Sequence, residues 1–148
     1  MSSSNKPGAV LTESQREYLR GNRSLDNAAE RNARKAIRDR VRQALLDFVL
    51  VHQRLEQRDR EQIFEQAERF SESIDDSTTH GIQYMLAFGY LGLKEQGYEK
   101  DSVEQILANA IRNAENRRSE ENPGLGTVIG VDVDIHISRN YPIGEDIE

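Results

Sequence analysis

The chain has 148 residues, a net charge of -6, 31% charged residues and no cysteine. This length suits one domain with one core, and the missing cysteine excludes disulfides, a thiol nucleophile and a thiolate zinc site. No apolar stretch is long enough to span a bilayer and no apolar signal core opens the chain, so we expect a cytoplasmic protein without membrane contact.

The charge is unevenly distributed along the chain. Residues 1–60 hold 13 basic against 8 acidic side chains, whereas residues 61–148 hold 7 against 18. Such asymmetry indicates a basic binding face on an otherwise acidic body. Arginine outnumbers lysine by 16 to 4. Together with the acidic balance, this composition favours an archaeal, halophilic source.

The N-terminal part predicts a disordered leader and then a short helix. Residues 1–10 are polar and form the leader. Thr12 and Gln15 have the spacing of a capping box, in which each side chain bonds the other residue's backbone amide. The helix that follows is expected to end before Gly21, a residue that suits the left-handed position after a helix.

A long second helix is predicted over residues 28–55. Its apolar residues are spaced by 4, 3, 4, 3 and 4 positions, which is a heptad seam: Ile37, Val41, Ala44, Phe48, Val51 and Leu55. The seam fits a long core helix of a bundle, with a coiled coil as the alternative. The side chains expected to be buried are Ile37, Val41, Ala44, Phe48 and Leu55.

Three further helices are expected in the second half of the chain. One covers residues 59–70, and the next covers residues 79–96 and is apolar on nearly all sides, which is typical of the buried centre of a domain. Three glycines in that helix indicate close helix approach: Gly81, Gly89 and Gly92. A capping box over residues 102–105 predicts the start of the last helix. The predicted helical domain spans residues 11–114, and a linker spans residues 115–124.

The C-terminal region, residues 125–148, predicts a strand and a tail. Apolar and polar residues alternate from Ile129 to Ser138, which is the pattern of a half-buried strand over residues 127–138. A lone strand leaves its backbone groups unpaired, so we expect it to pair with a second copy of the chain, or with residues 9–11. The predicted fold is therefore mainly α, a bundle of about five helices with one C-terminal β-strand.

Three N-terminal stretches resemble a known group of proteins. They read LTESQREYLRG at residues 11–21, AIRDRVR at residues 36–42 and LLDF at residues 45–48. They resemble a loose group of small haloarchaeal proteins of unknown function, with an "LTxxQRxYLxG"-type helix and an arginine-rich "RxRxR" helix. The resemblance covers residues 11–65 and implies an archaeal, cytoplasmic setting. It carries over no catalytic residue.

A basic row on the second helix is the candidate binding site. Its members step by three or four residues and share one face: Arg31, Arg34, Lys35, Arg38 and Arg42. Arginine forks bind phosphates through paired hydrogen bonds, and phosphate contacts carry no sequence information. The row therefore predicts weak, sequence-independent nucleic-acid binding. The alternative is a solvated face whose arginines meet acidic surface, in a self-associating protein–protein interaction module.

No catalytic or cofactor-binding pattern is visible. Asp132, Asp134 and His136 share one face of the predicted strand and could hold a cation or transfer protons, but no metal-ligand or phosphate-loop motif accompanies them. We interpret this face as the solvent-facing polar side of the strand. The expectation is a small, non-enzymatic accessory or regulatory protein without cofactor or metal, and a homo-oligomer through residues 127–138.

Overall fold

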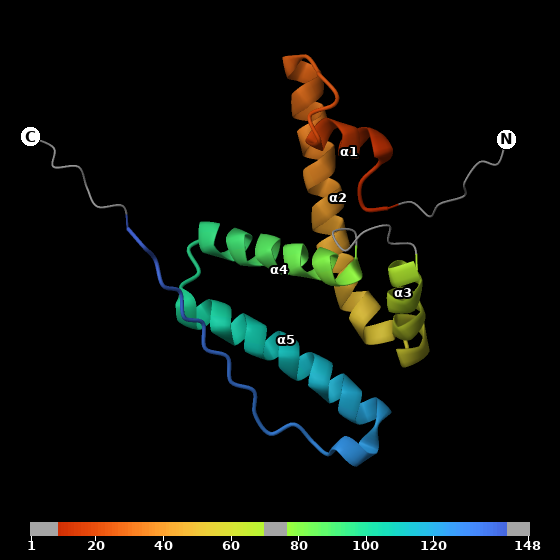
Figure 1. Cartoon of the computed structure of the whole chain (residues 1–148), viewed down its shortest axis with the longest axis vertical. Helices are drawn as coiled ribbons and strands as arrows, with labels where there is room; N and C mark the ends of the chain where they lie inside the picture. The colour runs from red at the N-terminus through yellow and green to blue at the C-terminus, as the bar shows by residue number, and fades with distance from the viewer. Residues whose placement is uncertain (1–8, 70–76, 142–148) are drawn as a thin grey trace, which may run out of the picture. The chain divides into compact units, whose positions relative to one another are not determined.

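The computed structural model describes residues 9–69 and 77–141. These residues form five α-helices and one short 3₁₀ helix, so the chain is mainly α, as predicted (Figure 1). The helices are α1 (Glu13–Leu19), α2 (Asn27–Arg54), α3 (Gln57–Arg69), α4 (Thr78–Glu95) and α5 (Lys100–Glu121), followed by η2 (Pro123–Leu125). The predicted leader lies mostly outside the described residues.

The chain divides into two compact units, and the boundary lies within α3. The first unit ends at Arg60 and the second begins at Glu61. The predicted linker over residues 115–124 is largely helical, because α5 continues to Glu121. That stretch contains no glycine or proline before Pro123, and ion pairs one turn apart support it, at 2.6 Å for Arg117–Glu121 and 2.8 Å for Arg118–Glu115.

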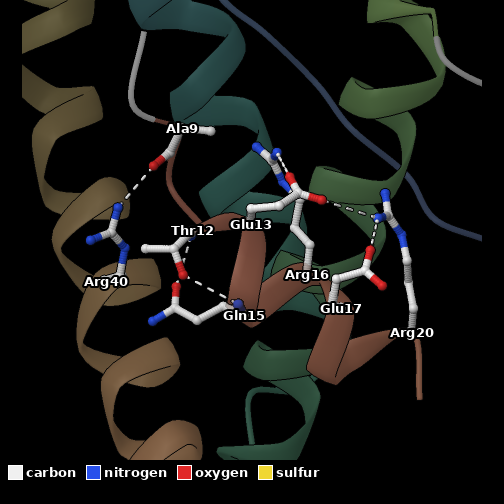
Figure 2. Close-up of polar contacts among 8 residues, drawn as sticks. All are labelled: Ala9, Thr12, Glu13, Gln15, Arg16, Glu17, Arg20 and Arg40. Atoms are coloured by element: carbon white, nitrogen blue, oxygen red, sulfur yellow. Dashed lines mark hydrogen bonds and ion pairs between the residues drawn. The ribbon is translucent and has the colours of Figure 1, made fainter. Parts of the chain in front are cut away.

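The first unit opens with the predicted capping box. The Gln15 amide donates to Thr12 Oγ1 at 3.2 Å, and the Thr12 amide donates to Gln15 Oε1 at 3.0 Å (Figure 2). Gly21 has a φ of 78° and ends the α1 turn in the left-handed conformation, also as predicted. Arg40 of α2 donates to the carbonyls of Ala9 and Val10, so residues 9–11 are held against α2 and form no strand.

Helix α2 is continuous, as predicted, but its seam is covered only in its first half. Ile37, Val41 and Ala44 are half-buried, whereas Phe48 is 51% exposed and Val51 38%. The prediction of a buried seam is therefore wrong for Phe48. Within this unit, α1 and residues 9–11 contact α2 between Glu30 and Asp47, and Leu55 at the end of the seam is half-buried.

Helix α4 begins at the Ser77 cap, whose Oγ accepts from the His80 amide at 3.2 Å, and it ends at Gly97 with a φ of 85°. The prediction that α4 is a buried centre is wrong: most of its large apolar side chains are exposed, Tyr84 by 64% and Phe88 by 57%, whereas Tyr90 and Leu93 are half-buried. Its glycines do not mark a close approach either, since no described atom lies within 4 Å of a Cβ built on any of them.

Helix α5 and the C-terminal segment form the packed part of the second unit. Val103 and Ala108 on α5 are the two buried side chains among the described residues. The predicted capping box over residues 102–105 is wrong, because the N-cap of α5 lies three residues earlier, at Glu99, which makes no side-chain hydrogen bond. After η2, Gly126 turns the chain with a φ of 76°. Residues 127–141 then return beside α5 (Figure 1).

The C-terminal segment is not a strand of any sheet within the described residues, which corrects the prediction for residues 127–138. The alternation assigned the faces correctly in the middle of the segment, where Val131, Val133 and Ile135 are half-buried and the residues between them are exposed. At its two ends, Ile129 and Ile137 are exposed, against the prediction. A strand needs a ladder of backbone hydrogen bonds, and a neighbouring helix has no free backbone groups along its side to supply one.

Candidate functional site

The basic row of α2 is fully exposed on the first unit. All five predicted residues lie outward: Arg31, Arg34, Lys35, Arg38 and Arg42. The helix thus brings together the side chains that the spacing grouped. Three of them are also engaged by carboxylates of the same helix, at 3.3 Å for Arg34–Glu30, 2.8 Å for Lys35–Asp39 and 3.6 Å for Arg42–Asp39.

Arg34 belongs to a small cluster that joins α1 to α2. The Tyr18 hydroxyl donates to Glu30 Oε1 at 2.9 Å, and the Arg34 guanidinium lies 5.7 Å from the centre of the Tyr18 ring. The hydrogen bond from Tyr18, and then that from Arg34, lower the pKa of Glu30. Arg34 therefore has a structural role in the first unit besides its place in the row.

Asp39 offsets part of the charge of the row. The hydrogen bond from Lys35 is the main cause that lowers the pKa of Asp39, and the charges of Arg42 and Arg38 add to it. The carboxylate stays ionised at neutral pH, so it competes with any external anion for Lys35 and Arg42.

Arg31 and Arg38 are the two members of the row whose guanidinium groups have no partner among the described residues. Neither makes a hydrogen bond or ion pair with any residue in the described part of the chain. They lie seven positions apart, two helical turns or about 10 Å along the axis. In the described part of the chain, the guanidinium groups of Arg31 and Arg38 are therefore available to bind an external anion.

The acidic face of the C-terminal segment does not assemble a metal site. Asp134 is bound by Lys100 Nζ at 2.7 Å, and His136 Nε2 lies 3.2 Å from Ser138 Oγ. No group of three potential ligands that could hold a metal ion occurs among the described residues. This face is a polar surface on which Asp134 and His136 already have partners within the chain.

A family model matches residues 10–142, which is nearly all of the described chain. The chain belongs to the DUF8102 family, a domain of unknown function. This membership agrees with the resemblance to an uncharacterised group. No curated protein and no solved structure matches the DUF8102 chain. In the described part of this DUF8102 domain, no helix is both long and apolar enough to cross a membrane.

The sequence missed one polar cluster in the DUF8102 domain, which attaches the C-terminal segment to α5. Lys100 Nζ lies 2.7 Å from both Glu104 Oε1 and Asp134 Oδ1, and Glu104 Oε1 also accepts from the Ile135 amide at 2.9 Å. These hydrogen bonds, Asp134 first, raise the pKa of Lys100, and the bond from Lys100 lowers the pKa of both carboxyls. Lys100 and Glu104 are one helical turn apart, but the two contacts to the C-terminal segment join residues more than 30 positions apart, so no local spacing signals them.

The sequence also missed how much apolar surface stays open in the DUF8102 chain. On the second half of α2, six of seven consecutive residues are large, apolar and exposed by 38% to 59%: Leu45, Leu46, Phe48, Val49, Leu50 and Val51. Apolar patches of this kind usually mark interaction surfaces. The heptad spacing placed Phe48 and Val51 on one face but could not say what covers them.

Proposed function

We propose that the protein is a small, non-enzymatic accessory protein that acts by self-association through its helices. The observation that carries this proposal is the exposed continuation of the α2 seam at Phe48 and Val51. Burial of one large apolar side chain stabilises an interface by about 1.5–3 kcal/mol. Consecutive residues of a helix point to different sides, so one interface would bury part of the six exposed residues, with Phe48 and Val51 at its centre.

A second copy of the chain is the simplest partner for this surface. A heptad seam presents holes spaced for the knobs of another helix with the same 3.5-residue repeat. The α2 helix of another copy has that repeat by definition, because its seam keeps steps of 4 and 3 from Ile37 to Leu55. Self-association through α2 therefore needs no further component.

The mass of the full-length chain in solution tests the proposal. We expect light scattering to give at least twice the 16.9 kDa of one chain. Phe48→Asp should lower that mass, because the interface would bury an unpaired charge. Gln53→Asp adds the same charge on the opposite side of α2, so it is the matched control and should leave the mass unchanged. A monomeric wild-type chain would overturn the proposal.

Binding to a nucleic-acid backbone is the second candidate, and the free guanidinium groups of Arg31 and Arg38 favour it. The net charge of -6 and the neighbouring Asp39 limit the affinity. Fluorescence anisotropy with a labelled duplex of about 20 base pairs, at about 50 mM salt and above, is the test. Removal of one arginine that binds a phosphate should reduce the slope of log affinity against log salt by about one unit.

Variants of matched charge show whether duplex binding depends on the basic row or only on the net charge of the protein. Arg31→Ala and Arg38→Ala should each reduce the salt slope, whereas Arg16→Ala on α1 removes the same charge from a residue already paired with Glu13 at 3.2 Å. An equal effect of all three variants, or no binding at about 50 mM salt, would eliminate this candidate.

The proposal includes a cytoplasmic setting in an archaeal halophile. The excess of 26 acidic over 20 basic residues supports it, because a negative surface keeps proteins soluble at high salt. High salt also strengthens burial of apolar surface and screens charge pairs. Such a setting would favour self-association over phosphate binding, and raising salt should therefore increase the mass in solution while weakening any duplex binding.

A further inference from the structure

The C-terminal segment offers one backbone edge that nothing in the described chain occupies. Apart from the Ile135 amide, no backbone group of residues 127–138 makes a hydrogen bond with a described residue. In an extended chain, the backbone groups of successive residues point to opposite edges. The Ile135 amide points to Glu104 on α5. The groups of Asp134 and His136 therefore point away from α5.

We propose that residues 131–139 pair antiparallel, through this outer edge, with the same residues of a second copy. The inference rests on the self-association proposed above and adds a site of different chemistry to it. An unpaired edge is a template for another extended chain, and main-chain hydrogen bonds supply the affinity. The contacts of Lys100 and Glu104 with Asp134 and Ile135 favour pairing, because they hold the segment in place before the partner binds. Ordering the segment in advance reduces the entropic cost of binding.

Charge determines which register such a pair adopts. A two-fold axis at Val133 places Asp132 opposite Asp134, and an axis at Asp134 places that carboxylate opposite its own copy. Both registers are opposed by like charge. An axis at Ile135 instead places Asp134 opposite His136 and Asp132 opposite Ser138. Lys100, at 2.7 Å from Asp134, further reduces the negative charge on this face.

The same register keeps apolar pairs on the inner face, although an axis at Val133 would give more of them, so charge and not apolar matching selects the axis at Ile135. An axis at Ile135 pairs Ile135 with its own copy and Val133 with Ile137 on both sides. Moving the axis to His136 would place Val133 opposite Arg139, which removes that apolar pair. Cross-strand pairs of β-branched residues are favourable at this separation. The paired strands would also cover part of Ile137, which is 51% exposed in the single chain.

Two proline variants of the full-length chain test the pairing. His136→Pro removes an amide from the outer edge. Ile137→Pro removes an amide from the edge that faces α5, where that amide makes no hydrogen bond with a described residue. Proline suits an extended backbone at either position. We expect His136→Pro to halve the mass of the assembly or weaken its association at least tenfold, and Ile137→Pro, which loses an apolar side chain of the interface but no hydrogen bond to the partner, to weaken association clearly less; equal effects would overturn the pairing.

Amide hydrogen exchange gives a second readout that needs no variant. Raising the protein concentration from about 10 µM to about 1 mM should slow exchange at Asp134 and His136 by at least about tenfold, while Ile135 is protected throughout. Concentration-independent exchange at Asp134 and His136 would overturn the pairing.

The variants Phe48→Asp and His136→Pro test the two proposed association surfaces separately. If Phe48→Asp yields single chains but His136→Pro does not change the mass, the α2 interface stands and the strand pairing is wrong. If His136→Pro dissociates the assembly and Phe48→Asp does not, the pairing stands and the α2 interface is wrong. A monomeric wild-type chain would overturn both.

Discussion

The two long helices α2 and α5 both have ion pairs one turn apart, but they differ in their caps and in how well their apolar side chains are covered. Helix α2 has a side-chain cap, with Asp26 accepting from the Ala29 amide at 2.8 Å, and ion pairs one turn apart along its basic half. Its apolar residues from Leu45 to Val51 nevertheless stay exposed. Helix α5 has no side-chain cap, yet its Val103 is 1% exposed.

The difference shows that local and long-range contacts contribute separately to these helices. Signals for α2 lie within a few residues of one another, so the helix is specified by its own sequence. Helix α5 is stabilised by the C-terminal segment, through Lys100, Glu104 and the half-buried Ile135. Comparing the free energy of unfolding of variants of the two helices measures how much each kind of contact contributes to stability.

The largest expected effect comes from placing a charge under the C-terminal segment. Val103→Asp should lower the free energy of unfolding by about 3 kcal/mol or more, because it buries an unpaired carboxylate. Val49→Asp on α2 is the matched substitution at a side chain that is 56% exposed. In dilute solution it should change stability by about 0.5 kcal/mol. Thermal melts followed by circular dichroism measure both, and equal losses would contradict the comparison.

A smaller effect is expected from the helix caps. Asp26→Ala should cost about 1 kcal/mol, since it leaves the Ala29 amide without its side-chain acceptor. Glu99→Ser should gain about 0.5–1 kcal/mol, because the N-cap of α5 already has an extended backbone, with φ -85° and ψ 174°, but no bonding side chain. Ser102→Ala is the control and should be neutral. A large loss with Ser102→Ala would mean that the helix starts there after all.

The smallest expected effect is the pH dependence of the contacts that hold the C-terminal segment against α5. Lys100 lowers the pKa of Glu104 and Asp134, so their contribution is fully present above the ordinary carboxyl pKa of about 4 and is lost as pH falls through the lowered values. Carboxyl and amide NMR signals of Glu104, Asp134 and Ile135 should therefore change together below about pH 4. Lys100→Met should move the two carboxyl pKa values up towards their ordinary range, and unchanged values would refute the cluster.

Much of the secondary structure could be predicted from the sequence. The capping box at Thr12, the left-handed Gly21 and the heptad spacing of α2 depend on residues within one or two turns of each other, and the structure confirms all three. The basic row likewise follows from helical spacing alone, and its residues are exposed together. Its pairing with Glu30 and Asp39 is also local and readable from the same spacing.

Burial and strand pairing could not be predicted in the same way. The apolar residues of α4 and of the last turns of α2 predicted a core, but they are exposed in the single chain, and the alternation of residues 129–138 predicted a strand that has no ladder among the described residues. Periodicity reports which side chains share a face and says nothing about what lies against that face.

The sequence by itself determined where the helices run and which faces are basic or apolar, because these properties depend on neighbours within a few residues. Only the tertiary structure decided that Lys100 and Glu104 of α5 hold Asp134 and Ile135 of the C-terminal segment, and that the seam stays open at Phe48 and Val51. The contacts that hold the segment join residues 31 and 34 positions apart, and the free energy of such contacts leaves no local pattern in the chain.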